Sequence, residues 1–374
     1  SIRRQRQMCI RDRIFVLFCM VLIMPSEEYE TVNYDIPNMC DYYTHIKGNG
    51  EDKVTLMVYM VGSDLESDGG AASEDIAEMT AANADNINIT LQTGGAAAWE
   101  NASISDGKTE RHIIKNGELQ NVENLGEAQM TSPNTLTDFI KWSASNYPAD
   151  RYELVLWNHG GGTALGFGYD EMYPDDMLSL SQIGNALSDS GIKFDIVGFD
   201  ACLMGTIETA YMLEPYADYL VASEEYEPGT GWYYSEWLKN LSDNTSMPTV
   251  EIGKKIVEDY INGPDSSFFD SNTLSIVDLR EIPYTYSKLC EIMQQEEGVL
   301  DSRYSVISQA RYNAKSFGDG EYEQIDIKSY LEECGKSDTE LDKVLRSAVK
   351  YSGSSSYNSN GLAMYFPYDY PDYY

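Results

Sequence analysis

Stretches rich in apolar residues alternate with amphipathic segments through the first two thirds of the chain. The apolar stretches are short and end at polar or glycine-rich turns, which is typical of strands buried on both faces of a sheet. They predict strands at 54–61, 87–92, 154–157, 196–199 and 219–222. The amphipathic segments predict helices at 73–82, 135–145, 181–187 and 205–213. This alternation predicts an α/β fold with a mainly parallel sheet flanked by helices.

Three local signals refine this picture. Residues 111–122 predict a β-hairpin that turns at Asn116-Gly117. Ser73 is expected to open the helix at 73–82. In the helix at 135–145, an apolar stripe is interpreted as a core face; it consists of Leu136, Phe139, Ile140 and Trp142.

The pattern changes after about residue 240. Helices at 250–261 and 282–296 flank a strand at 273–278, and polar loops follow at 318–321 and 352–360. We therefore predict a catalytic α/β domain over 50–240 and a C-terminal α+β subdomain over 241–374.

The N-terminal segment, 1–49, is left out of the fold prediction. Its first 13 residues are basic and precede an apolar run over 14–24, which resembles a secretory signal. The run is too short for a stable membrane span, and no small-residue cleavage site follows Met24. The first 13 residues also resemble translated sequencing-adapter read-through. The segment is thus a signal remnant or a sequence artefact.

Charge and cysteine content exclude several classes of function. The formal net charge is −35 over 374 residues, which opposes binding to nucleic acid or to an anionic membrane. It is compatible with cationic peptide substrates and equally with a surface adapted for solubility. The six cysteines are far apart and lack the spacing of a zinc site or a disulfide framework. The sequence does not define an oligomeric state, and we expect a monomer.

Two short motifs follow neighbouring predicted strands and carry candidate chemistry. They read NHGGG over 158–162 and DACLMG over 200–205. Because parallel strands place their carboxyl ends at one edge of a sheet, His159 and Cys202 are expected to meet there. A thiolate is a nucleophile, and an imidazole can accept the thiol proton and later protonate a leaving amine. The N–H of Gly160 is a candidate donor to the oxyanion, and the helix after Cys202 favours an anion at its start.

Each residue also has an ordinary interpretation. A lone cysteine after an apolar strand is often a small buried side chain, and a lone histidine before glycines is often a turn residue. The pairing of the two motifs favours acyl transfer instead. The other histidines, His45 and His112, lie in polar surroundings and are predicted at the surface. Cys290 is predicted in the core and Cys334 at an exposed helix end.

The two motifs resemble the catalytic motifs of clostripain-like cysteine peptidases, relatives of the caspases, legumain and gingipains. The likeness spans roughly 50–370. Weaker resemblances lie at 58–66, 222–232, 273–278 and 361–367. The family likeness implies a caspase-like three-layer sandwich.

The resemblance also implies roles for individual residues. Cys202 matches the nucleophile and His159 the general acid and base, with no third carboxylate required. The N–H groups of Gly160 and Cys202 match the oxyanion hole. Asp200 matches the floor of the pocket for the residue before the scissile bond, where a carboxylate selects Arg or Lys. Asp64 is assigned to the same pocket by analogy. The alternative for Asp200 and for Asp64 is a helix cap or turn.

Two departures from the family stand out. Several relatives mature by a cut after a basic residue between the two motifs, but here that stretch contains only Lys193, and the acidic loop at 169–177 contains none. We therefore expect no self-cut there. The chain also ends soon after an apparent strand, so the C-terminal subdomain is expected to be truncated.

The resemblance leads to a prediction about function. It predicts a cysteine endopeptidase, secreted or on the cell surface of a bacterium, that acts on proteins or peptides with basic residues. It requires no cofactor. Calcium is an implied option, with acidic clusters at 64–68 and 170–176 as candidate ligands, although neither has the spacing of a calcium loop and solvated acidic loops are the alternative. The alternative function is a catalytically silent relative that binds peptides or a surface partner; ligase action is a third interpretation that shares the acyl-enzyme.

Overall fold

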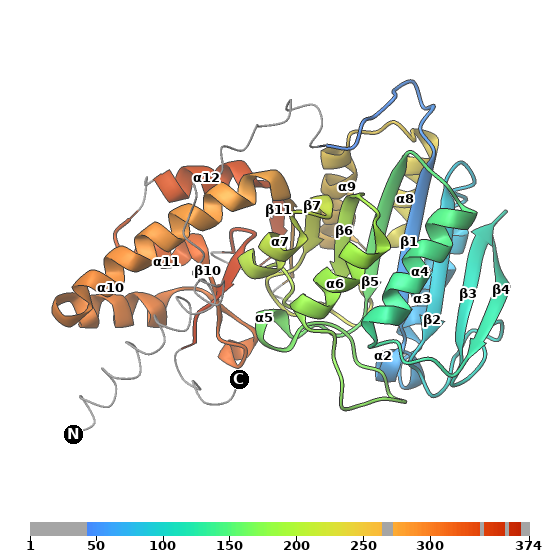
Figure 1. The fold of residues 1–374 in the computed structure, drawn as a ribbon, viewed down its shortest axis with the longest axis horizontal. Helices are drawn as coiled ribbons and strands as arrows, with labels where there is room; N and C mark the ends of the chain where they lie inside the picture. The colour runs from blue at the N-terminus through green and yellow to red at the C-terminus, as the bar shows by residue number, and fades with distance from the viewer. Residues whose placement is uncertain (1–42, 264–271, 337–339, 356–358, 368–374) are drawn as a thin grey trace.

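A nine-stranded sheet forms the centre of the computed structural model, which describes residues 43–263, 272–336, 340–355 and 359–367 (Figure 1). The strand order is β11-β8-β7-β6-β5-β1-β2-β3-β4. The strands are β1 (Val54–Val61), β2 (Asn88–Gly94), β3 (Thr109–Lys115), β4 (Glu118–Gly126), β5 (Arg151–Trp157), β6 (Phe194–Asp200), β7 (Ala217–Ala222), β8 (Thr273–Asp278) and β11 (Val349–Ser354).

The middle of the sheet is parallel and its two edges are antiparallel. Strands β7, β6, β5, β1 and β2 run in one direction, with Met60 of β1 paired to Trp157 of β5 and Trp157 paired to Asp200 of β6. Strands β3 and β4 extend one edge as a hairpin, and β8 and β11 extend the other. The loops that follow β1, β5 and β6 therefore leave the sheet side by side, at the place where the strand order reverses and α/β proteins commonly bind ligands.

Helices cover both faces of the sheet and produce two separate hydrophobic cores. One face is covered by α4 (Pro133–Asn146), α6 (Leu180–Ser190) and α7 (Ile207–Leu213), which share one core with the C-terminal helices. The other face is covered by α3 (Ala71–Ala81), α8 (Tyr234–Asp243) and α9 (Thr249–Asn262). Buried apolar strand residues such as Leu154 and Val155 point alternately into the two cores, which explains the uninterrupted apolar pattern of the strands.

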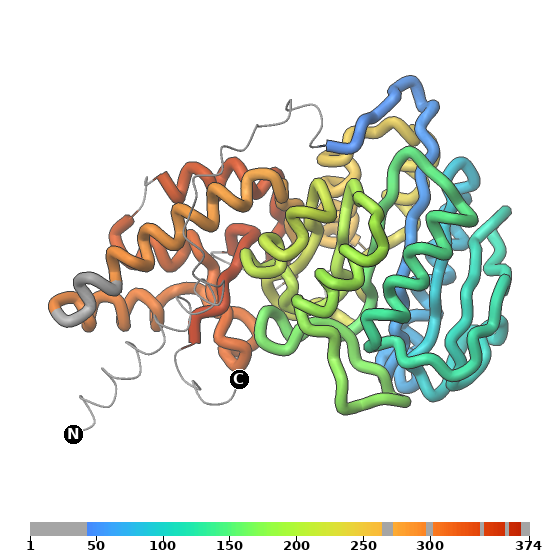
Figure 2. Tube along the Cα trace, viewed as in Figure 1, coloured from blue at the N-terminus to red at the C-terminus, as the bar shows by residue number. Residues whose placement is uncertain are grey.

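The C-terminal part lies to one side of the sheet and is dominated by a long helix (Figure 2). This helix is α10 (Ile282–Asn313). It is accompanied by α11 (Ile327–Glu333), α12 (Glu340–Ala348) and a small sheet of β9 (Ser316–Phe317), β10 (Gln324–Asp326) and β12 (Ala363–Tyr365). The division of the chain near residue 240 remains a prediction; β8 and β11, which follow it in sequence, pair with the central sheet.

The structure confirms the predicted α/β sandwich and most of its elements. The hairpin turns at Asn116-Gly117 as expected. The helix predicted from Ser73 begins at Ala71 instead, after Gly70 in a left-handed conformation. The helix predicted to end at residue 296 continues to Asn313. Almost all of the segment at 1–49 lies outside the described residues.

Three predictions for single residues were wrong. His112 is fully buried on β3, where its ring pairs with the Thr93 hydroxyl at 3.0 Å, and burial lowers its pKa to about 4. Cys334 is buried at the end of α11, whereas Cys290 is only half-buried. In each case the error concerned burial, because local polarity does not reveal which elements pack over a residue.

A buried ion pair joins the first residue of β5 to β6 and to the connection between α8 and α9. The Arg151 guanidinium contacts Asp195 at 2.5 Å, and both side chains are fully buried. It also donates to the carbonyls of Thr245 and Met247 and to the Thr249 hydroxyl. Arg151 therefore joins β5, β6 and α9.

We expect Asp195→Ala to lower the free energy of unfolding by about 3–5 kcal/mol, because it leaves the Arg151 charge buried without its anion. Urea denaturation of the two proteins measures this difference. The control is Asp243→Ala, which breaks the exposed pair with Lys239 and should change stability by less than about 1 kcal/mol. Equal losses in the two variants would contradict the role given to the buried pair.

Candidate active site

The two sequence motifs lie on adjacent loops at the carboxyl edge of the sheet. His159 comes two residues after the end of β5, and Cys202 comes two residues after the end of β6. The two strands are directly paired. The helix expected after Cys202 begins at Ile207, so the cysteine lies on the loop before it. The structure thus brings together the cysteine and the histidine predicted from the sequence.

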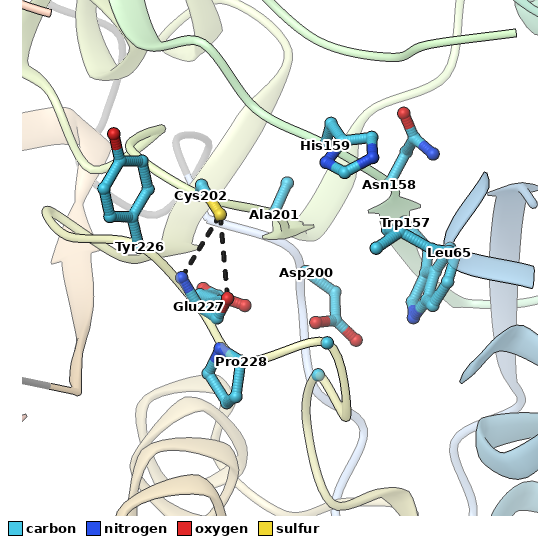
Figure 3. Close-up of a pocket in the computed structure, with 12 residues that line it drawn as sticks. Leu65, Trp157, Asn158, His159, Asp200, Ala201, Cys202, Tyr226, Glu227 and Pro228 are labelled. Atoms are coloured by element: carbon cyan, nitrogen blue, oxygen red, sulfur yellow. Dashed lines mark hydrogen bonds between the residues drawn. The ribbon is translucent and has the colours of Figure 1, made fainter. Parts of the chain in front are cut away.

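These loops enclose a pocket of ≈ 250 Å³ (Figure 3). That volume suits one long side chain and is smaller than a typical site for a drug-sized ligand. His159 and Cys202 both line it. The other lining residues are Leu65, Trp157, Asn158, Asp200, Ala201, Tyr226, Glu227, Pro228, Gly229 and Gly231.

The Cys202 thiol contacts the backbone of the loop that follows β7. Its Sγ accepts a hydrogen bond from the Glu227 N–H at 3.2 Å and lies 3.7 Å from the Glu227 carbonyl (Figure 3). Burial raises the pKa of Cys202, and the neighbouring carboxylates of Asp200 and Glu225 raise it further, against a lowering by the Glu227 N–H. The thiol is therefore protonated at neutral pH and needs a base before it can act as a nucleophile.

His159 is the base within reach of the same pocket. Its side chain is 38% exposed, so the ring can meet a bound substrate. Its Nε2 lies 2.8 Å from the Asp64 carboxylate, and its ring meets that of Tyr169 edge to face. The described residues show no hydrogen bond between His159 and Cys202, an arrangement common in free enzymes, where such contacts tighten only with substrate bound.

The amide of Asn158 fixes the loop that carries His159. Its Nδ2 donates to the carbonyl of Val61 and to the hydroxyl of Ser63, and its Oδ1 accepts from the N–H of Tyr169. Asn158 is buried, so these bonds are shielded from water. The loops after β1 and β5 are thereby joined directly beside the histidine.

Close packing explains the first glycine of the motif. A Cβ on Gly160 would lie 2.0 Å from the Cys202 carbonyl oxygen, so only glycine allows the two loops to approach. The Gly160 N–H donates to none of the described acceptors, because the neighbouring bonds run from Gly161 to Gly166 and from Gly168 to His159. The Cys202 N–H likewise donates to no backbone carbonyl among the described residues.

Residue Leu203 adopts a left-handed conformation, with φ 65°. This is uncommon for a side chain of its size and is typical of backbone held in place by its surroundings at functional sites. The Gln324 side chain of the C-terminal part supplies such support. It donates to the Leu203 carbonyl and accepts from the Thr163 N–H, so it bridges the two catalytic loops.

Buried carboxylates lie at the inner side of the pocket. Asp200 is 4% exposed and accepts hydrogen bonds from the Tyr234 hydroxyl at 2.7 Å and the Trp232 N–H at 3.2 Å. Burial raises its pKa to about 6, and hydrogen bonds from Tyr234, from Trp232 and from the Glu227 carboxyl partly offset this. Burial and the charges of Asp200 and Cys202 raise the pKa of Glu227 well above its usual range. Two carboxyl groups without a cation are thus held where a cationic side chain would stabilise their charged forms.

Asp200 lines the pocket together with Glu227, a residue that the sequence analysis did not name. Its position in the sequence could have indicated this, because Glu227 follows β7. Strand β7 lies next to β6 and ends at the same edge of the sheet. Asp64 is absent from the pocket lining, and its carboxylate contacts His159 instead. Lys193 lies just before β6, at the opposite end of that strand from Cys202.

In the two acidic stretches considered for calcium, the buried carboxylates accept hydrogen bonds from the protein itself. Glu66 accepts hydrogen bonds from the N–H and hydroxyl of Ser73, and Asp170 accepts from the N–H of Met130. Among the described residues, no group of three His, Cys, Asp or Glu side chains is arranged to hold a metal ion. Calcium binding by these two stretches therefore remains a prediction.

A cysteine and a histidine at adjacent strand ends of this sandwich are typical of cysteine peptidases. A model of the clostripain family matches residues 58–359. The chain belongs to the clostripain family of cysteine peptidases.

Individual proteins of this family are similar to the chain in sequence or in fold. Clostripain of Hathewaya histolytica is 32% identical over 225 residues, a match that covers 50% of this chain and 42% of clostripain. The chain thus matches less than half the length of that relative. The fold is similar to a secreted cysteine protease from Bacteroides thetaiotaomicron bound to an irreversible peptide inhibitor, with a TM-score of 0.64, 18% identity, and coverage of 86% of this chain and 97% of that one. It is also similar to an inactive zymogen from Parabacteroides distasonis, with a TM-score of 0.59, 18% identity, and coverage of 84% and 92%.

Proposed function

We propose that this protein is an endopeptidase that cleaves after Arg or Lys through an acyl-enzyme on Cys202. The observation that supports this most is the combination within one pocket of a thiol, an imidazole and two buried carboxyl groups (Figure 3). The thiol and imidazole supply the chemistry of acyl transfer. The carboxyl groups supply a preference for a cation.

The reaction begins when the side chain before the scissile bond enters the pocket. His159 takes the Cys202 proton, and Sγ attacks the substrate carbonyl carbon. The N–H groups of Gly160 and Cys202 donate to the oxyanion that forms. The tetrahedral intermediate collapses as protonated His159 gives its proton to the leaving amine, which leaves a thioester. His159 then removes a proton from water, which attacks the thioester and releases the acid and the free thiol.

Specificity arises from charge at the inner side of the pocket. A guanidinium or ammonium group placed against Asp200 and Glu227 regains the solvation that it loses on burial. A neutral or acidic side chain would leave both carboxyl groups without a cation. The Arg and Lys preference follows from this pairing. Clostripain, similar to half of this chain, is consistent with it.

The site of action is proposed as outside the cell or at its surface. One bacterial structure with a similar fold is described as a secreted protease. No helix within the described ranges is long and apolar enough to cross a membrane.

Gly160→Ala should lower kcat by about 10- to 100-fold, because its Cβ would meet the Cys202 carbonyl and move a donor away from the oxyanion. Hydrolysis of a peptide ending in Arg measures the loss. The control is Gly107→Ala on a remote loop, where a Cβ would meet open space. Alanine strains the left-handed backbone at Gly107, so this control is compared in kcat and not in stability. Unchanged kcat in Gly160→Ala would contradict the assigned donor.

The test of the whole proposal is a panel of fluorogenic peptides that differ only in the residue before the reporter group: Arg, Lys, citrulline, Asn and Asp. We expect cleavage after Arg or Lys alone. Cleavage of citrulline at the rate of Arg would contradict the charge-based specificity. A folded protein that binds the Arg peptide without cleaving it would support the silent peptide-binding alternative.

A further inference from the structure

His159 has a partner that the two-residue chemistry does not require. The Asp64 carboxylate, on the short helix α2 (Ser63–Ser67), lies 2.8 Å from Nε2 of the His159 ring. Asp64 is not among the described residues that line the pocket, although its neighbour Leu65 is. The contact joins the loop after β1 to the loop after β5.

The fold fixes this contact through the preceding residue of each loop. Ser63 and Asn158 are hydrogen bonded at 2.8 Å, and the next residues, Asp64 and His159, are bonded in turn. Ser63 is buried and has a left-handed backbone with φ 52°, a conformation uncommon for serine. The unusual turn directs the carboxylate of Asp64 towards the imidazole. Backbone strain of this kind is typical of functional sites.

The chemistry of the pair determines which ring nitrogen is free. Partial burial acts to raise the pKa of Asp64, but the hydrogen bond and charge of His159 and the hydroxyl of Ser63 lower it overall. An ionised carboxylate only accepts hydrogen bonds, so Nε2 must carry a hydrogen. Nδ1 is then the nitrogen left to take the thiol proton.

We propose that Asp64 is a positioning residue for His159, which holds the ring with Nδ1 free for the Cys202 proton and stabilises the imidazolium that forms. This inference rests on the proposed peptidase function. The other titratable groups that line the pocket are Cys202, Asp200, Tyr226 and Glu227, and the ring of Tyr169 packs against the imidazole from outside this lining. None of these has a described hydrogen bond to the imidazole. The Asp64 side chain is 47% exposed, so solvent weakens its effect on the imidazolium.

The expected effect is a loss of about tenfold in kcat for Asp64→Ala, with KM for an Arg peptide unchanged. Asp64→Asn keeps an acceptor for Nε2–H and should lose less, but it removes the charge that stabilises the imidazolium. In both variants the acidic limb of the kcat/KM profile should move to lower pH, because His159 accepts the thiol proton in its neutral form and the carboxylate that stabilises its imidazolium is gone. The control is Asp68→Asn, which removes an exposed charge just after α2 and should retain the wild-type profile. A higher KM for Arg peptides with kcat unchanged would overturn the inference and return Asp64 to the pocket.

A second measurement separates this inference from the proposed function. The rate of Cys202 alkylation by iodoacetamide, followed at neutral pH by mass spectrometry of the Cys202 peptide, needs no substrate. We expect slower labelling in Asp64→Asn and Asp64→Ala than in the wild type and in Asp68→Asn. If the wild type cleaves no Arg or Lys peptide but the labelling rates differ as expected, the proposed specificity fails and the positioning role stands. Equal labelling rates overturn the positioning role whatever the peptides show.

Discussion

Replacement of Cys202 with alanine is expected to lower kcat for an Arg peptide by about 10⁴-fold or more. Without the nucleophile the site can still bind the substrate and stabilise an oxyanion, but no acyl-enzyme can form. The side chain is small and lies on a loop, so the variant should fold. Initial rates and a thermal melt of the purified variant measure both points.

The matched control for this variant is Cys290→Ala. Cys290 is a half-buried free thiol on α10, outside the pocket. Its variant should keep kcat within about twofold, because it removes a thiol without touching the site. Loss of activity in Cys290→Ala with retention in Cys202→Ala would contradict the assignment of the nucleophile.

Replacement of Asp200 with asparagine is expected to lower kcat/KM for Arg and Lys peptides by about 10²- to 10³-fold. Loss of one partner from a buried charge pair typically costs 2–5 kcal/mol, and each 1.4 kcal/mol is a factor of ten. Asparagine has nearly the same shape and can still accept from Tyr234 or Trp232 through its amide oxygen. Cleavage of the citrulline peptide, which is neutral, should therefore change far less. A parallel loss for both peptides would show that the variant has damaged the fold of the pocket.

Asp200 also makes the preference for Arg over citrulline depend on pH in a predictable direction. Because burial raises the pKa of Asp200 to about 6, the carboxyl is charged above that pH and neutral below it. In the wild type, kcat/KM for Arg relative to citrulline should therefore fall as the pH drops through about 6. The ratio should be low and independent of pH in Asp200→Asn. A ratio that stays constant from pH 8 to 5 in the wild type would exclude Asp200 as the charge that selects the cation.

The sequence predicts the central sheet well because its strands have a simple physical signature. Strands such as Val54–Val61 are buried throughout and almost entirely apolar, and the turns after them contain glycine or a hairpin pair. The same periodicity fails for α10, whose hydrophobic pattern is weak, so its second half was missed. Burial of His112 also escaped prediction, since it depends on a neighbouring strand and its Thr93 hydroxyl.

The candidate site was predictable to the extent that its residues follow strand ends. His159, Cys202 and Asp200 meet because β5 and β6 are neighbours, which alternation of strands and helices already suggests. The contact of Asp64 with His159 requires β1 to lie beside β5. No local sequence pattern indicates that these two strands, which are far apart in the chain, are neighbours in the sheet. The support from Gln324 comes from more than 120 residues after Cys202. Contacts of that kind depend on the complete fold.

In the proposed mechanism, Cys202 attacks the carbonyl carbon of a basic residue. We would measure the intact mass, followed by a peptide map, of the protein treated with a peptidyl chloromethyl ketone that ends in Arg, beside the same reagent ending in citrulline. The Cys202 thiolate displaces chloride from the reagent and forms a stable thioether. We expect one added peptidyl group on Cys202 from the Arg reagent, much slower addition from the citrulline reagent, and none in Cys202→Ala. Modification of another residue, or equal labelling by the two reagents, would contradict this mechanism.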